Sequence, residues 1–237
     1  ACAASAEAIA QGARAIARGE VDVVLVGGHD AMVHPLGMLS FQALGALGTV
    51  ARPFDRRRDG FVLGEGAALL CLEAADRCKR PLGYVLGSGS SSDAYGVTAP
   101  HPSGMGAEAA MRRALRDAGV EPHQVDWVNA HATGTTVGDR AEMLALARVF
   151  GRVPVSSLKG AVGHCLAAAG ALEAVATIAA WQHGFTPGTV GCEQPESDAQ
   201  VLVGPLGRAP ELVLSNSFGF GGQNVSLVLA RDGRWTS

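Results

Sequence analysis

Short apolar runs of strand length alternate with helical segments along most of the chain. Residues 21–28 (VDVVLVGG) form a continuous apolar run closed by two glycines, which is typical of a strand buried on both faces. Further strand-like runs occupy residues 125–131 and 153–157, and helical patterns lie at residues 3–18, 104–118, 139–150 and 164–183. Strands that alternate with helices predict parallel βαβ units, so we expect an α/β fold.

Composition excludes several classes of function. The chain has 237 residues, is 48% hydrophobic and carries a formal net charge of −3, so it can bury a sizeable core. Its local basic cluster, residues 56–58, is too short for a nucleic-acid-binding stripe, and its apolar runs are too short or too interrupted to span a membrane. The five cysteines are odd in number and contain no CxxC pair, which predicts a reduced, cytoplasmic protein without disulfides or a metal site.

The chain opens with ACAAS, which places Cys2 at the start of a helical pattern of small residues. A helix N-terminus can lower the pKa of a cysteine and make it nucleophilic, and small neighbours leave room for a substrate. The alternative is a buried structural cysteine, which is common. Position alone does not decide between the two.

Three further segments carry chemistry-bearing residues at junctions between strands and helices, where functional groups gather in α/β folds. His131 follows a strand in NAHATGTT, and His164 precedes an Ala-rich helix in LKGAVGHCLAAAG. In SNSFGFGGQN, glycines after a strand can aim backbone N–H groups at a ligand, as an oxyanion hole requires. Each segment also has an ordinary structural interpretation: either histidine could be a satisfied core residue, and FGFGG could be a plain hairpin turn.

Taken in order, these segments resemble the β-ketoacyl synthase family, the condensing enzymes of fatty acid and polyketide synthesis, and the elongating type II enzymes in particular. The resemblance also covers GGHDAM, PFDRRRDGFVLGEGAALLCLE and SSSDAY, and so runs through nearly the whole chain. It implies a thiolase-like five-layer αβαβα sandwich, of which this chain covers the part from the nucleophile onward. Residues 1–82 are then the remainder of the N-terminal half, and residues 83–237 form the C-terminal half.

The resemblance also implies a role for each matching residue. Cys2 takes the acyl chain as a thioester, and the backbone N–H groups of Cys2 and Phe220 form the oxyanion hole. His131 and His164 stabilise the enolate formed when a malonyl thioester loses carbon dioxide. Lys159 organises the site, and we expect it to pair with Glu142 as structural support. The remaining implied residues are the phosphopantetheine-binding hydroxyls Thr133 and Thr135 and the aromatic pair Phe218 and Phe220, with Phe220 as the gate.

The function implied is a decarboxylative Claisen condensation with malonyl-acyl carrier protein, without a cofactor or metal. The implied partners are an acyl carrier protein and a second synthase chain, in a homodimer or a heterodimer. Family members carry more than a hundred residues before the nucleophile, so we expect the preceding part of the fold on a separate chain or in a segment left out of this sequence. The alternatives are a silent chain-length-factor subunit, which usually lacks the nucleophile, a thiolase, which uses a second cysteine near its C-terminus, and a more remote Cys–His hydrolase.

Overall fold

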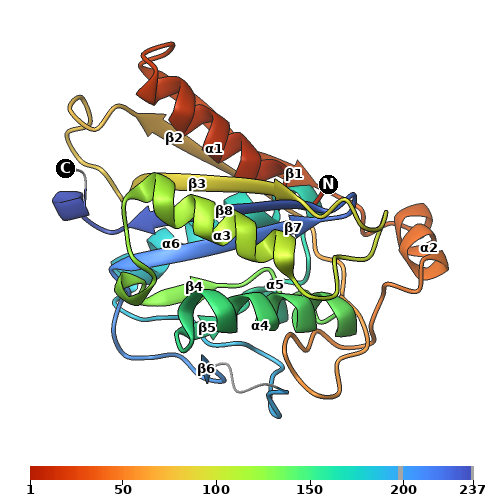
Figure 1. Cartoon of the computed structure of the whole chain (residues 1–237). Coiled ribbons are helices and arrows are strands. Elements are labelled where there is room, and N and C mark those ends of the chain that lie inside the picture. Colours follow the sequence, from red (N-terminus) through yellow and green to blue (C-terminus); the bar gives the residue numbers. More distant parts are fainter. Residues whose placement is uncertain (197–199, 236–237) are drawn as a thin grey trace.

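The computed structural model describes residues 1–196 and 200–235, in which helices and strands alternate (Figure 1). The α-helices are α1 (Ala4–Ala17), α2 (Pro35–Ala43), α3 (Met105–Ala118), α4 (Thr136–Phe150), α5 (Lys159–Val162) and α6 (Ala169–His183). The strands are β1 (Val23–Asp30), β2 (Gly66–Glu73), β3 (Tyr84–Ser92), β4 (Trp127–Asn129), β5 (Pro154–Ser156), β6 (Gln200–Val201), β7 (Leu212–Gly219) and β8 (Gln223–Ala230). Single 3₁₀ turns are η1 (Pro122–Gln124), η2 (Leu166–Ala168) and η3 (Gly233–Trp235).

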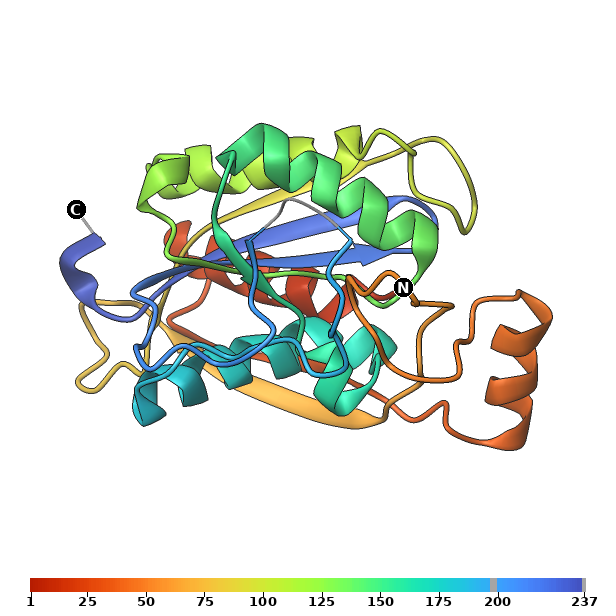
Figure 2. The same ribbon diagram turned by 90° about the horizontal axis from the view of Figure 1, so that it is seen from below.

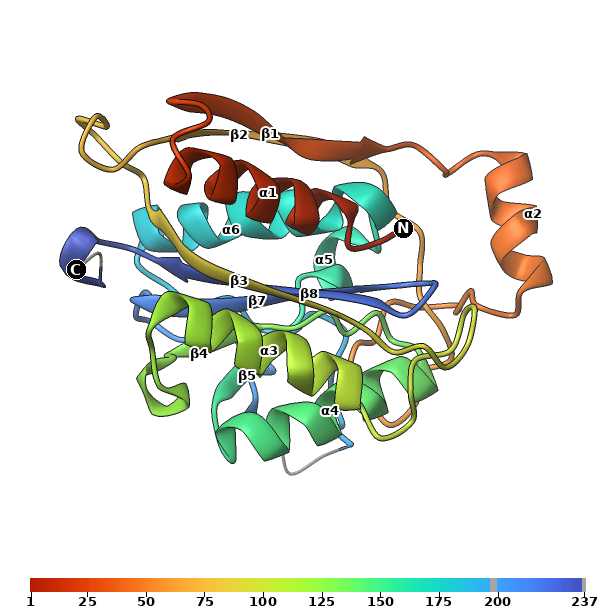
Figure 3. The same ribbon diagram turned by 45° about the horizontal axis from the view of Figure 1, so that its top comes forward.

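These elements stack in layers. Among the described residues, β1 and β2 form an antiparallel pair, and a larger sheet has the order β3-β8-β7-β4-β5-β6. Its middle strands are parallel, whereas β8 and β3 add antiparallel at one edge. Figure 3 shows α1 and α6 side by side between the two sheets, with α3 and α4 on the far face of the larger one. The described residues therefore form four consecutive layers of the expected five-layer sandwich.

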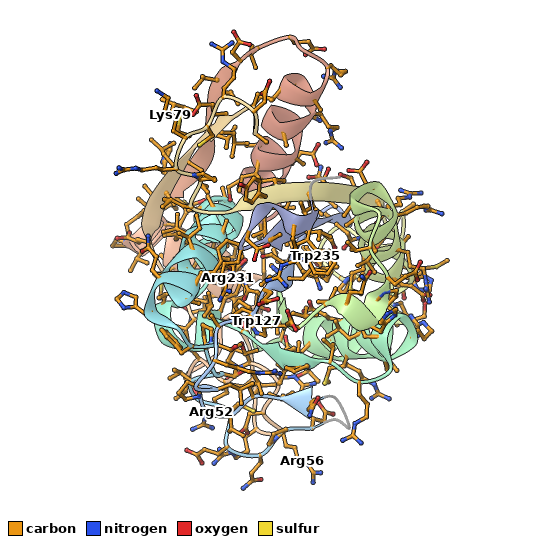
Figure 4. The ribbon with its side chains drawn as sticks, turned by 90° about the vertical axis from the view of Figure 1, so that its left-hand side faces the viewer. Arg52, Arg56, Lys79, Trp127, Arg231 and Trp235 are labelled. Carbon is orange, nitrogen blue, oxygen red and sulfur yellow. The ribbon has the colours of Figure 1, made fainter. Side chains whose placement is uncertain are left out.

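The central helices pack closely because their inward faces are small. Ala6, Ile9 and Ala10 of α1 are fully buried, and a Cβ added at Gly12 would lie 2.5 Å from the Val26 side chain. The same apolar cluster contains Trp127 of β4, near the middle of the molecule in Figure 4. Its indole Nε1 donates to the Ser156 hydroxyl (2.9 Å), so its one polar atom is satisfied in the core.

A break replaces the single helix that the sequence predicts over residues 164–183. The chain forms the short helix α5, leaves helical geometry around His164, makes the turn η2 and only then enters α6. Gly163 has a φ of +73° and Leu166 a φ of +47°, and a right-handed helix cannot contain either angle. Because of this break, His164 lies before α6 rather than within it.

Two apolar surfaces remain open. Helix α2 projects from the side of the molecule, where Figure 2 shows it apart from the layers, and its Leu36 and Leu39 are exposed. On the outer face of the small sheet, Leu25 and Leu69 are 69% and 71% exposed. No described residue covers these side chains.

Candidate active site

Cys2 lies directly before α1, where the sequence predicts a nucleophile. The first helical residue is Ala4, whose N–H donates to the Ala1 carbonyl (2.9 Å). The Cys2 side chain is 8% exposed and lines a cavity of about 340 Å³. The thiol is therefore at once buried and open to a ligand of small-molecule size.

The electrostatic state of Cys2 is set mainly by its burial. Burial raises the pKa of the Cys2 thiol above its ordinary value of 9.0, and the positive charge of Lys159 and the N–H groups of Phe220 and Cys2 oppose the rise without reversing it. A helix N-terminus can lower the pKa of a cysteine, but at Cys2 burial has the larger effect. A helix end contributes at most about 2 kcal/mol in a partly buried site, and lost hydration outweighs it here. Cys2 is therefore a thiol at neutral pH.

The glycine-rich stretch after β7 folds into a turn that packs on Cys2. Strands β7 and β8 pair as far as Gly219 opposite Gln223, and a Cβ added at Gly219 would lie 3.1 Å from the Cys2 nitrogen. The backbone N–H groups of Phe220 and Cys2 both interact with the Cys2 sulfur. Two converging N–H groups can hold the carbonyl oxygen of a thioester, although the oxyanion hole itself stays a prediction.

His131 and His164 face each other in the cavity that Cys2 lines. Their ring centroids are 5.3 Å apart, with the ring planes at 84°. Burial lowers the pKa of both imidazoles well below 6.5, and the charge of Lys159 lowers both pKa values further. Both rings are therefore neutral at pH 7, and each can donate one hydrogen bond.

Lys159 does not pair with Glu142. Its ammonium group contacts the Glu173 carboxylate in a buried ion pair, in which the side chains are 2% and 4% exposed. Lys159 begins α5 and Glu173 lies near the start of α6, so the break at His164 folds the two segments together. Glu173 is the one acidic residue of the mostly apolar α6. A buried charge needs a counterion, so this pattern could have revealed Glu173 from the sequence.

Glu142 supports the first histidine instead. Its two carboxylate oxygens accept the backbone N–H groups of His131 (2.9 Å) and Ala132 (2.7 Å). The Asn216 side chain of β7 donates to the same carboxylate (2.9 Å). Glu142 thus fixes the loop after β4 to α4 and to the central sheet.

The two threonine hydroxyls line the same cavity. The Oγ1 atoms of Thr133 and Thr135 are 3.2 Å apart, in the loop that leads into α4. Asp139, to which the sequence gave no role, holds this loop by accepting the N–H groups of Gly134 (3.0 Å) and Phe54 (2.8 Å). An acidic residue in the first turn of a predicted helix is the sequence signal that could have found it.

The predicted aromatic pair lies beside the histidines. Phe218 and Phe220 both line the cavity, and the Phe218 ring centroid is 5.7 Å from that of His131. Sequence reasoning gave no role to three further lining residues. These are Phe41, Phe61 and Leu166. Phe61 and Leu166 lie within motifs that carry the family resemblance, whereas Phe41 lies outside them.

The predicted absences concern metals and membranes. Within residues 1–196 and 200–235, no cluster of three His, Cys, Asp or Glu side chains could hold a metal ion. No helix in that part of the chain is both long and apolar enough to cross a membrane.

The fold is shared with solved ketosynthase structures. The ishigamide ketosynthase/chain length factor superposes with a TM-score of 0.92 at 37% identity, covering 98% of this chain and 59% of that one. A type II PKS acyl-carrier protein in complex with its ketosynthase bound to the hexaketide gives 0.93 at 30% identity, covering 98% and 62%. The chain thus has the thiolase-like fold of ketosynthases.

The sequence matches agree with the fold. The N-terminal domain of beta-ketoacyl synthase matches residues 1–77, and its C-terminal domain matches residues 82–193. The chloroplastic 3-oxoacyl-[acyl-carrier-protein] synthase II of Arabidopsis thaliana is 43% identical over 97% of this chain and 46% of its own length. The chain belongs to the β-ketoacyl synthase family and spans about half the length of this curated relative.

Proposed function

We propose that this chain is the nucleophile-bearing part of an elongating β-ketoacyl synthase, an acyltransferase that condenses a cysteine-bound acyl group with a malonyl thioester. One observation carries the proposal: a buried thiol and two neutral imidazoles, from Cys2, His131 and His164, line a single cavity of about 340 Å³. A silent subunit has no need of this combination. Condensation needs a nucleophile that holds one substrate and hydrogen-bond donors that activate the other.

The first step loads the acyl chain. The Cys2 sulfur attacks the carbonyl of an acyl thioester, a new C–S bond forms, and the bond to the carrier sulfur breaks. The thiol proton ends on the departing carrier thiol. The N–H groups of Cys2 and Phe220 stabilise the oxyanion formed on the way, because both lie at the Cys2 sulfur.

The second step uses the two histidines. The bond between the malonyl carboxylate and its α-carbon breaks, carbon dioxide leaves, and the electron pair remains as a thioester enolate. His131 and His164 donate hydrogen bonds to the enolate oxygen, which neutral imidazoles can do without giving up a proton. The enolate carbon then attacks the Cys2 thioester, and Cys2 leaves as a thiolate that takes a proton from solvent. The product is a β-ketoacyl thioester.

The remaining site residues hold the substrate and the machinery. Thr133 and Thr135 bind the phosphopantetheine arm at the entrance, and Phe220 gates the acyl pocket. The Lys159 charge helps to keep both histidines neutral, and Glu142 holds the backbone of His131 in place. No metal or other cofactor takes part in these steps.

The partners follow from the same chemistry. We propose an acyl carrier protein as substrate donor and a second synthase chain, identical or related, as dimer partner; the solved neighbours include a ketosynthase with its carrier and a ketosynthase/chain length factor. We place the boundary between the two halves of the fold near residue 82. The location is cytoplasmic, with a plastid as the alternative raised by the chloroplastic relative.

The test uses the full-length protein that carries this chain. Acyl-carrier thioester is added, and intact-protein mass spectrometry measures the mass gain of the wild type and of Cys2→Ala. The proposal expects one acyl mass in the wild type and none in the variant. Carbon dioxide release from malonyl-carrier is then measured for Cys2→Gln and His164→Ala. Release should persist in Cys2→Gln and collapse in His164→Ala, which should still accept acyl groups.

Two outcomes would overturn the proposal. A folded wild-type protein that gains no acyl mass from a competent carrier would favour a silent partner subunit. Normal elongation by both Cys2→Gln and His164→Ala would show that the roles are misassigned.

A further inference from the structure

A segment far away in the sequence holds the backbone of His164. Residue Leu63 forms a parallel bridge with His164. The N–H of His164 donates to the Val62 carbonyl (2.7 Å), and the His164 carbonyl accepts the N–H of Gly64 (3.0 Å). Since His164 lies in the break between α5 and η2, this pairing replaces the support that a regular helix would give it.

Residues 60–64 lie close to the backbone around His164 because a glycine stands at each end of this segment. A Cβ added at Gly64 would lie 2.3 Å from the Val162 carbonyl oxygen. Gly60 has a φ of +152°, and a Cβ there would lie 2.4 Å from the Gly48 nitrogen. Both positions therefore require glycine, and residues 60–64 form a rigid bracket around His164.

Within this bracket, Phe61 places its ring against the His164 imidazole. The ring centroids are 5.4 Å apart, and the planes meet at 89°, an edge-to-face contact. Phe61 is 3% exposed. Its backbone is anchored at both polar groups: its N–H donates to Ala46 (3.0 Å), and its carbonyl accepts from Gly48 (2.9 Å). The ring is thus a fixed wall of the cavity.

The His164 imidazole is oriented by packing against aromatic rings more than by hydrogen bonds. The buried Nδ1 atom of His164 has no hydrogen-bond partner among the described residues. An imidazole is ordinarily oriented by a hydrogen bond at the nitrogen that does not act in catalysis. Here aromatic rings enclose it, with Phe61 on one side and His131 on another.

We propose that Phe61 is a positioning residue for the second histidine: its ring edge fixes the plane of the His164 imidazole and keeps water away from it. This inference rests on the proposed function, because the positioned group is the one assigned to malonyl decarboxylation. Phe61 itself forms no bond with the reacting atoms. The Lys159 charge acts on His164, and the titratable groups that line the same cavity are His131, the Cys2 thiol, Glu142, Asp59 and Asp93.

The test compares Phe61→Leu, Phe61→Tyr and the matched control Leu63→Ala in the full-length protein. Leucine fills much of the space but lacks the ring, tyrosine keeps the ring, and Leu63→Ala removes a buried side chain from the same apolar cluster. Malonyl decarboxylation is measured as kcat, KM and a pH profile. For each variant, the thermal midpoint reports folding.

Phe61→Leu should lower kcat by roughly 10- to 100-fold, the range expected when a catalytic group is misplaced by about 1 Å, with KM changed less than kcat. Water reaching the imidazole raises the pKa of His164, so the acid limb of the profile should move to higher pH. Phe61→Tyr should keep both kcat and the acid limb close to their wild-type values. Leu63→Ala should lower the thermal midpoint without moving the acid limb. An unchanged kcat and acid limb in Phe61→Leu, or an equal shift in Leu63→Ala, would overturn the inference.

A second readout separates this inference from the proposed function. The His164 imidazole is titrated by NMR in histidine-labelled protein, with His164→Ala identifying its signal. If the wild type releases no carbon dioxide, the proposed function fails, and the titration still decides the role of Phe61. A higher His164 pKa in Phe61→Leu than in wild type and Leu63→Ala supports positioning, and equal values refute it.

Discussion

Replacing Glu173 by glutamine should destabilise the protein strongly, because it leaves the Lys159 ammonium buried without its ion-pair partner. Both side chains are almost fully buried, and they touch. Unit charges about 4 Å apart attract by about 4 kcal/mol at an effective dielectric constant of about 20. Removing one partner of a buried pair typically costs about 3–5 kcal/mol. We therefore expect Glu173→Gln to lower the free energy of unfolding by about 3–5 kcal/mol.

The partner variants separate the pair from the packing. Lys159→Met leaves Glu173, whose pKa burial already raises above 4.5. An acid whose folded pKa is raised binds more protons when folded, so stability falls as pH rises from 4.5 towards the folded pKa. Lys159→Met should therefore be more stable at pH 5 than at pH 8. The double variant Lys159→Met/Glu173→Leu should recover most of the loss, since apolar pairs often replace buried ion pairs at little cost.

Urea unfolding at pH 7, followed by circular dichroism, measures each variant. The single variant Glu173→Leu is added, so that the wild type, Lys159→Met, Glu173→Leu and Lys159→Met/Glu173→Leu form a double-mutant cycle. A coupling energy of roughly 3 kcal/mol between Lys159 and Glu173 is the expected result. A cost below about 1 kcal/mol for Glu173→Gln, or a double variant as unstable as the sum of the single ones, would refute the reasoning. The first result would mean that the pair is hydrated, and the second that packing dominates.

Other residues allow further tests. Burial raises the pKa of Asp139 from 3.8 to about 7, so the contribution of Asp139 to stability falls as the pH rises from 4 to 7. Asp139→Asn should therefore show a smaller fall in thermal midpoint between pH 5 and pH 8 than the wild type, measured by calorimetry. Alkylation of Cys2 by iodoacetamide should rise with a midpoint above pH 9.0 because burial raises the pKa of the thiol, and Lys159→Gln should move the midpoint higher because the Lys159 charge lowers that pKa. Leu166 has a φ of +47°, so Leu166→Gly should be at least as stable to urea as Leu166→Ala, against the usual penalty of about 1 kcal/mol for glycine.

Local patterns predicted the regular elements well. The small-residue stretch at residues 3–18 corresponds to α1 (Ala4–Ala17), and the apolar run at residues 21–28 overlaps β1 (Val23–Asp30). Helix α2 was missed although it has clear start signals: Pro35 is its first residue, and the His34 side chain accepts the Gly37 N–H (3.2 Å) as an N-cap. A helix of nine residues with exposed leucines lacks the polar outer face by which a sequence pattern predicts a surface helix.

The order of the motifs predicts which chemistry-bearing residues form the site. It does not predict which residues these side chains pair with. The sequence marks Cys2, His131 and His164, and all three line one cavity. The break at His164 was not predicted, because it depends on a leucine in a left-handed conformation that sequence patterns do not favour. That same break brings Lys159 to Glu173. One unforeseen backbone feature therefore accounts for the wrong helix boundary and the wrong ion pair.

The pKa values of the site residues depend on how the fold places the charges, and no single motif predicts them. Lys159 lowers the pKa values of Cys2, His131 and His164 together. At the Cys2 thiol, the Lys159 charge lowers the pKa that burial raises. At both imidazoles, burial and the Lys159 charge lower the pKa together. One buried cation thus favours proton loss from the nucleophile and keeps the two donors neutral. Glu173 pairs with the Lys159 ammonium in its buried position, so the placement of this charge depends on an acid near the start of α6 that is not among the predicted site residues.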